Sequence, residues 1–104
     1  MVEKISLRLV QDAARVLRCI GHPVRLRILE FLDSEGERNV TAIQEALGLE
    51  QAVASRHLSL MRDRGILENR REGAQVFYRV RDDRVTKILD CLRGCELPGA
   101  AEGR

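Results

Sequence analysis

The 104-residue chain is long enough for one domain with a modest core and too short for two independent ones. Apolar residues make up 44% of it and only three residues are aromatic, so the core must consist of Leu, Ile, Val and Ala, which favours helices over a β-sandwich. No apolar run approaches the roughly 20 residues of a membrane span, and three cysteines without a signal sequence argue against a disulfide scaffold. The net charge is only +2, but residues 56–81 hold seven arginines against three acidic residues. We expect a cytoplasmic protein with free thiols and one basic segment.

Apolar residues recur at helical spacing over residues 5–20, which predicts a first helix. The sequence "GHP" at 21–23 interrupts it: Gly21 suits a helix end, His22 an N-cap and Pro23 the first position of a new helix. The second helix is expected to continue through Leu32 toward a polar turn at "DSEGE".

A short third helix is predicted after Val40, because Thr41 and Gln44 have the spacing of a capping box. Gly48 ends it, and a tight connection leads to a fourth helix over about 51–64 that buries Ala54, Leu58 and Met61.

Two β-prone runs, "ILENRR" and "QVFYRV", follow and are separated by "EGA", so we expect a β-hairpin with Gly73 in a left-handed turn. Asp82 or Asp83 then caps a fifth helix that ends near Gly94 or Cys95. Residues 1–95 are therefore predicted to form one domain and residues 96–104 a flexible C-terminal tail.

This order predicts a mainly α fold with a small β-hairpin, the plan of the winged helix-turn-helix proteins. On the fourth helix Gln51 and Arg56 have the reach and chemistry to read adenine and guanine, while Ala52, Ser55 and Ser59 are small enough for close approach to a base-pair groove. We also count Thr41 at the start of the third helix among the DNA-binding candidates. Arg70, Arg71 and Arg79 on the hairpin are candidates for phosphate contacts, with Gly73 at its tip. Double-stranded DNA is the predicted partner.

Other interpretations of these residues remain open. A polar helix face is ordinarily just solvated, and arginines on an edge strand ordinarily prevent sheet-to-sheet pairing. A winged-helix module that binds protein instead of DNA would carry hydrophobic residues on the outer face of the fourth helix, where only Val53 fits. An enzyme is disfavoured because no nucleophile is paired with a base, and we expect a structural hydrogen bond for His57.

Three blocks, "LRCIGHPVRLRILEFL" (17–32), "VTAIQEALGLEQAVASRHLSLMRDRGIL" (40–67) and "RREGAQVFYRV" (70–80), resemble the ArsR/SmtB family of metal- and stress-responsive bacterial repressors. The resemblance covers nearly the whole domain. It implies a homodimer through the first and last helices that binds an inverted repeat in an operator and is released by an inducer. It also implies that Gln51, Ser55 and Arg56 face bases and that Gly73 lies at the tip of the wing.

The chain departs from the family pattern at several positions. Glu50 replaces the usual Ser before the reading helix; its carboxylate can cap the helix, but it would also repel phosphate there. The Cys-x-Cys arsenic motif is absent from the third helix, residues 82–96 contain no His for a zinc site, and Glu30 stands where thiol-sensing members have one of two cysteines.

The cysteines are the remaining candidates for inducer sensing. Cys19 lies near the end of the first helix, and Cys91 and Cys95 would share a face of the last helix if that helix continues past Gly94. Three thiolates would suit a soft metal or metalloid ion such as As(III), and two would suit reversible oxidation or persulfide formation. The alternative is that Cys19 and Cys91 are small buried side chains and Cys95 is a spare residue at a frayed end.

Overall fold

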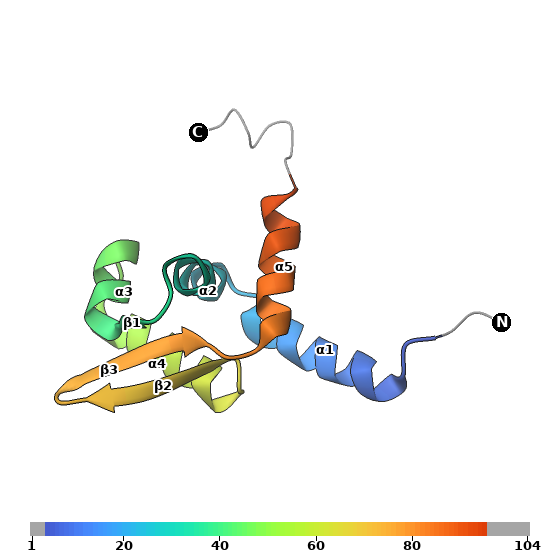
Figure 1. The fold of residues 1–104 in the computed structure, drawn as a ribbon, viewed down its shortest axis with the longest axis horizontal. Helices are drawn as coiled ribbons and strands as arrows, with labels where there is room; N and C mark the ends of the chain where they lie inside the picture. The colour runs from blue at the N-terminus through green and yellow to red at the C-terminus, as the bar shows by residue number, and fades with distance from the viewer. Residues whose placement is uncertain (1–3, 96–104) are drawn as a thin grey trace.

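The computed structural model describes residues 4–95, and Figure 1 shows their arrangement. In chain order the elements are α1 (Leu7–Ile20), α2 (Pro23–Glu35), β1 (Arg38–Asn39), α3 (Val40–Leu47), α4 (Gln51–Asp63), β2 (Leu67–Glu72), β3 (Gln75–Val80) and α5 (Asp83–Arg93). The predicted order of four helices, a hairpin and a fifth helix is confirmed, and one short strand is added. The predicted tail at 96–104 lies outside the described residues.

The helices and the sheet enclose one aliphatic core. Its fully buried members come from every helix and from the start of the hairpin; they include Ile28, Ile43, Leu58, Ile66 and Val85. Tyr78 on β3 is 4% exposed and is the aromatic residue among the buried ones. The expectation of a core built from Leu, Ile, Val and Ala is confirmed.

The ends of the first two helices follow local capping chemistry. α1 begins at Leu7, two residues later than predicted, because the Ser6 hydroxyl accepts a hydrogen bond from the Leu9 amide at 3.1 Å. His22 caps α2 as predicted, with its Nδ1 accepting from the Val24 amide at 3.1 Å. α2 also includes residues 33–35, which were expected in a polar turn. That turn is confined to Gly36 and its neighbours.

The predicted cap of α3 is wrong. Asn39, not Thr41, is the N-cap, and its side-chain oxygen accepts a hydrogen bond from the Ala42 amide at 2.8 Å. Thr41 is consequently the second residue of the helix and is exposed. Asn39 takes the cap because the preceding backbone is extended and paired with the sheet, which places the helix start two residues earlier.

The sheet has three antiparallel strands in the order β1-β3-β2. β1 was not predicted; it pairs Arg38 with Tyr78 and Asn39 with Phe77. The hairpin itself is confirmed, but its strands extend further than expected, so Glu72 pairs with Gln75 and the turn contains two residues instead of three. Gly73 has a φ of +63°, the left-handed conformation that the sequence predicted for it.

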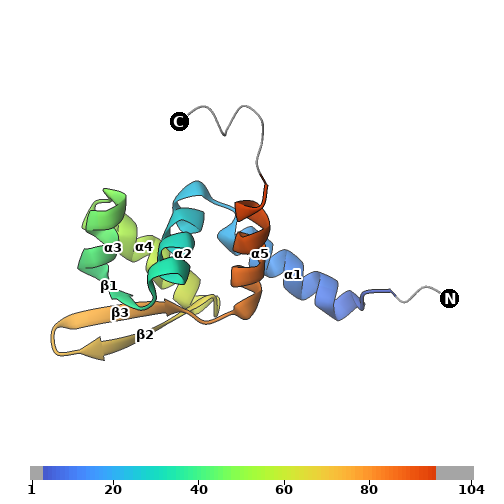
Figure 2. The ribbon, with the colours of Figure 1, turned by 45° about the horizontal axis from the view of Figure 1, so that its top comes forward.

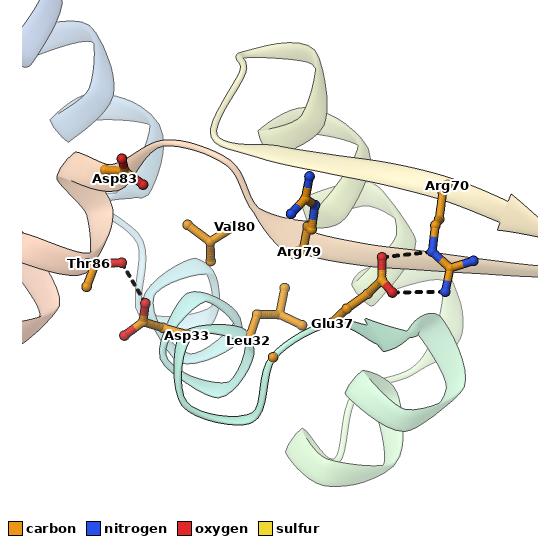
Figure 3. A pocket seen from close by; sticks show the side chains of 9 residues that line it. Leu32, Asp33, Glu37, Arg70, Arg79, Val80, Asp83 and Thr86 are labelled. Carbon is orange, nitrogen blue, oxygen red and sulfur yellow. Dashed lines mark hydrogen bonds and ion pairs between the residues drawn. The ribbon is translucent and has the colours of Figure 1, made fainter.

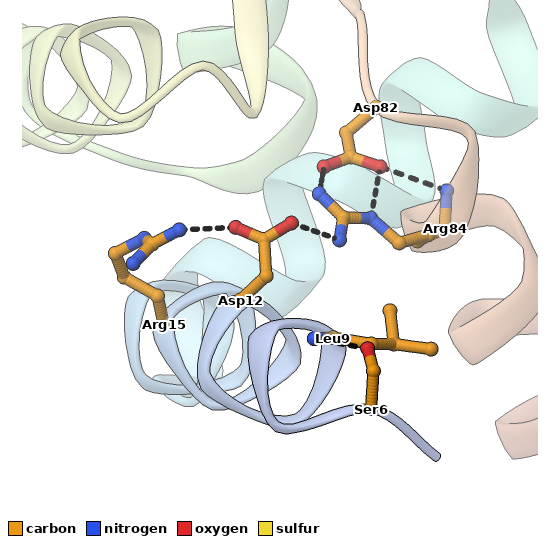
Figure 4. Close-up of polar contacts among 6 residues, drawn as sticks. All are labelled: Ser6, Leu9, Asp12, Arg15, Asp82 and Arg84. Atoms are coloured by element: carbon orange, nitrogen blue, oxygen red, sulfur yellow. Dashed lines mark hydrogen bonds and ion pairs between the residues drawn. The ribbon is translucent and has the colours of Figure 1, made fainter.

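α1 extends away from the body of the protein and packs through its C-terminal end, where Val16, Cys19 and Ile20 are buried (Figures 1 and 2). Arg84 at the start of α5 holds α1 in place, because its Nη1 donates to Asp12 of α1 at 2.7 Å (Figure 4). Its Nε and Nη2 donate to the two oxygens of Asp82 at 2.9 and 2.6 Å. These bonds to Arg84 lower the pKa of both carboxyl groups. The ionised cluster therefore links α1 to α5 at neutral pH.

Asp82 is the N-cap of α5, accepting from the Arg84 amide at 3.0 Å, and the helix ends at Arg93 before Gly94. Within residues 4–95 no helix is both long and apolar enough to cross a bilayer.

Candidate nucleic-acid interface

α3, the connection after it and α4 form the helix-turn-helix. Gly48 ends α3 with a φ of +65°, and its amide donates to the Gln44 carbonyl, so the chain reverses within three residues before α4 begins. Glu50 occupies the N-cap position of α4 but its side chain makes no capping hydrogen bond. The carboxylate that replaces the family's usual serine therefore leaves the first amides of α4 without that partner.

The inward face of α4 is the predicted one. Ala54, Leu58 and Met61 are 0% exposed and belong to the core. Gln51, Ala52 and Arg56 are exposed on other faces of the helix. The exposed side chains of α4 are thus small or polar, and none of the large hydrophobic residues exposed in the described part of the chain belongs to α4.

A groove of about 550 Å³ runs between α4, the start of α3 and one face of the hairpin. Five of the predicted DNA-binding residues line it: Thr41, Gln51, Ser55, Ser59 and Arg71. The three from α4 follow each other at four-residue spacing, so they form a stripe along the helix. The fold brings together, on one concave surface, residues that are 30 positions apart in the sequence.

Ala52 and Arg56 lie outside this groove, on the neighbouring exposed facet of α4. At four-residue spacing they form a second stripe beside Gln51, Ser55 and Ser59. The side chain of Arg56 can therefore contact a partner molecule that packs against the exposed face of α4 beside the groove.

The three predicted arginines of the wing do not share a face. Arg71 lines the groove beside α4, whereas Arg70 and Arg79 lie on the opposite side of the hairpin with Glu37 and Asp33 (Figure 3). Arg70 donates two hydrogen bonds to Glu37 at 2.9 and 3.0 Å, and Arg79 forms an ion pair with Glu68. The strand pleat causes this division, because neighbouring side chains point to opposite faces of a sheet.

Several residues of the groove were missed by the sequence reasoning: Asn39, Gln44, Arg62, Asn69 and Gln75. Two of them had a usable signal. Arg62 continues the α4 stripe three residues after Ser59, and Asn69 alternates with Arg71 along β2. The side chains at Gln44 and Gln75 depend on how α3 packs against the wing, which no local pattern indicates.

The cysteines are dispersed. Cys19 is 3% exposed, and this burial raises the pKa of its thiol; Cys91 and Cys95 are exposed. Since α5 ends at Arg93, Cys95 lies beyond the helix, so the condition for a shared helix face, a helix that continues past Gly94, is not met. Among residues 4–95 of a single chain, no three or more His, Cys, Asp and Glu side chains are grouped closely enough to hold a metal ion. The alternative in which Cys19 and Cys91 are small buried side chains therefore holds for Cys19 and not for Cys91 in the single chain.

Comparison with known proteins places this geometry in a family. A helix-turn-helix domain model matches residues 20–70. The transcriptional repressor PagR of Bacillus anthracis is 34% identical over 89 residues, which are 86% of this chain and 89% of PagR. The biofilm growth-associated repressor of Agrobacterium fabrum is 32% identical over 78% of this chain and 68% of that protein.

Solved structures agree with these relatives. The crystal structure of the repressor BigR from Xylella fastidiosa superposes with a TM-score of 0.78 at 30% identity, over 86% of this chain and 93% of that one. The homodimeric winged helix-turn-helix DNA-binding domain of Mb0332 from Mycobacterium bovis has a TM-score of 0.70 at 32% identity, over 89% of this chain and 87% of that one. Because the chain has this fold and these relatives, it belongs to the ArsR-type family of winged helix-turn-helix DNA-binding transcriptional repressors.

Proposed function

We propose that this chain acts in the cytoplasm as a homodimeric repressor that binds an inverted repeat in operator DNA and is released by an inducer. The observation that carries the proposal is the groove shared by α4 and the wing, in which Gln51, Ser55, Ser59 and Arg71 face one surface. A helix flanked by a basic ribbon is the arrangement with which winged helix-turn-helix proteins enter the major groove and contact the backbone.

The residues have distinct roles in this proposal. Gln51 and Arg56 read base edges, because Gln pairs with adenine and Arg with guanine through two hydrogen bonds each. Ala52, Ser55 and Ser59 let the α4 backbone approach the bases, and Thr41 faces the neighbouring phosphates. Of the three wing arginines, Arg71 makes the phosphate contact, supported by its place in the groove, while Gly73 lets the tip turn tightly.

The dimer is proposed to form through α1 and α5. Their outward apolar residues are about half exposed in the single chain: Leu9, Val10, Leu17 and Leu92. The homodimeric state of the Mb0332 domain, a relative by structure, supports this assembly. The symmetric dimer would place two α4 helices about 34 Å apart, one turn of DNA.

Binding to duplexes selected from a random pool tests the function. We expect affinity to fall steeply as salt rises, because each phosphate contact contributes about 0.9 to the slope of log affinity against log salt. Arg56→Ala should lower discrimination at one guanine by about 1 to 3 kcal/mol while leaving the discrimination at other positions intact. Arg27→Ala, which removes an exposed arginine of α2 that lies outside the groove, is the matched control for loss of a positive charge. A wild-type protein that selects no sequence from the pool would refute the proposal.

The inducer is proposed to act through the thiols at the end of α5, either by binding a soft metal or metalloid ion such as As(III) or by oxidation or persulfide formation. The exposure of Cys91 and Cys95 supports this assignment, since a thiol must be accessible to react. Cys19 fits less well, because its burial keeps the thiol protonated. Since residues 4–95 of one chain group no three such ligands, a three-thiol site would have to combine residues of two protomers.

A further inference from the structure

The two residues of β1 connect the helix-turn-helix to the wing. They follow Glu37, pair with Tyr78 and Phe77 in the middle of β3, and lead directly into α3. The outer part of the hairpin, residues 71–76 around the turn, has no third strand beside it among the described residues. The direction of the wing tip, including Arg71 and Gly73, therefore depends on side chains near this junction.

Arg70 makes the first of these side-chain links. Its Nε and Nη2 donate to the two oxygens of Glu37 at 3.0 and 2.9 Å (Figure 3). Its guanidinium also lies 4.6 Å from the ring centroid of Phe77, its cross-strand partner. A two-bond pair fixes orientation as well as distance. Arg70 also lowers the pKa of Glu37, so this carboxylate stays ionised at neutral pH.

Asn39 makes the second link. Its side-chain oxygen caps α3 at the Ala42 amide at 2.8 Å, and its side-chain nitrogen donates to the side-chain oxygen of Gln75 at 2.9 Å. Gln75 begins β3 next to the turn. One amide therefore joins the first helix of the helix-turn-helix to the outer part of the wing.

We propose that Arg70 and Asn39 are positioning residues that hold the wing at a set angle to α3 and α4, so that Arg71 meets the DNA backbone while α4 lies in the major groove. Arg70 acts through Glu37 and does not itself contact phosphate. This inference rests on the proposed DNA-binding function and adds the part of the protein that orients the wing.

The variant Glu37→Gln distinguishes this role from direct phosphate contact by the sign of its effect. If Arg70 contacted phosphate, removal of the competing carboxylate would free it and strengthen binding. If Glu37 and Arg70 orient the wing, Glu37→Gln weakens specific binding about threefold to tenfold although it removes a negative charge, Arg70→Gln weakens it equally, and the double variant is no worse than either.

The dependence on salt gives a second comparison on the same selected duplex. Arg71→Gln should lower the slope of log affinity against log salt by about 0.9, the amount expected for one phosphate contact. Arg70→Gln should leave this slope unchanged, because a loosened wing can still be ordered on the DNA at a cost in affinity, and Arg71 then makes the same phosphate contact. Asn39→Ser keeps a side chain that caps α3 but loses the donor to Gln75, and should weaken DNA binding about threefold without a change in melting temperature.

Amide hydrogen exchange on the DNA-free protein tests the wing by a route that does not require DNA binding. Exchange at residues 71–76 should be faster in Glu37→Gln, Arg70→Gln and Asn39→Ser than in the wild type, and unchanged in Arg71→Gln. Tighter DNA binding by Glu37→Gln, or wild-type exchange in all three variants, would overturn the inference. If the wild type selects no DNA, the proposed function fails, and the exchange rates still decide whether these residues hold the wing.

Discussion

His57 is a polar side chain in the apolar interior, although it directly follows the exposed Arg56. It is 9% exposed, and its Nδ1 accepts a hydrogen bond from the Nε of Arg25 at 3.1 Å. Arg25 also donates to the carbonyl of Cys19 at 2.9 Å, so this contact joins α1, α2 and α4. Burial lowers the pKa of His57, and the neighbouring charges of His22, Arg25 and Arg56 lower it further. The structural hydrogen bond expected for this histidine is confirmed.

Acid should destabilise the fold through His57. Because the folded pKa lies below the ordinary value of 6.5, the unfolded chain binds the proton first; the stability from this group is complete above pH 6.5 and is lost as the pH falls through the folded value. We expect the melting temperature to fall from about pH 7.5 to about pH 5.5. His57→Asn keeps an acceptor for Arg25 but does not titrate, so its melting temperature should fall less over this range.

Circular dichroism at a series of pH values measures both curves. The comparison depends on the slope with pH and not on the absolute stability of the variant. Parallel curves for the two proteins would show that His57 does not carry the dependence.

Among the described elements, α1 has the most large apolar side chains exposed to solvent. Leu17 is 52% exposed, and Val10, one heptad earlier on the same face, is 48% exposed. Asp12 on another face is bonded to Arg84, so the helix is held in place while its apolar face stays open (Figure 4). A surface of this kind is typical of a helix that packs against a partner.

Leu17→Glu should therefore disrupt the dimer without unfolding the chain. We expect the dimer dissociation constant to rise by about thirtyfold or more, because a charge replaces a large apolar side chain of the proposed interface. Gln11→Glu, at an exposed position on the polar side of α1, introduces the same charge and should leave dimerisation unchanged. Sedimentation equilibrium measures both. A Leu17→Glu protein that remains a dimer like the wild type would remove α1 from the interface.

The proposed release by an inducer would involve the complete dimer on its DNA, because a ligand can lower DNA affinity only if it prefers the free form of the protein. The exposed thiols of Cys91 on α5 and Cys95 just after it lie at the other end of this helix from the contact between Arg84 and α1. A modification there would act by changing the spacing of the two α4 helices.

Gel shifts with arsenite, zinc or polysulfide test this mechanism. We expect at least one additive to lower the affinity of the wild-type protein for its selected duplex by about tenfold or more. The same additive should have no effect on Cys91→Ser. Cys19→Ala should respond like the wild type, because Cys19 is buried. If Cys91→Ser responds to every additive as the wild type does, Cys91 is not the sensor.

The sequence by itself determined the helices, the hairpin and the inward face of α4. These depend on local spacing: an apolar stripe such as Ala54, Leu58 and Met61 has one helical face to occupy, and a Gly between two β-prone runs predicts a turn. The DNA-binding role of residues of α4 is also a prediction from the sequence, because their chemistry and spacing are visible without the fold.

Only the tertiary structure decided three features. They are the formation of β1, the capping of α3 by Asn39, and the separation of Arg71 from Arg70 and Arg79 on the two faces of the hairpin. A two-residue strand has no periodicity, and its partner Phe77 lies far along the chain. Alternation shows that neighbouring residues of a strand point to opposite faces, but not which face meets α4; the packing of the hairpin on the core settles that. Long-range pairing therefore decided which arginine enters the groove.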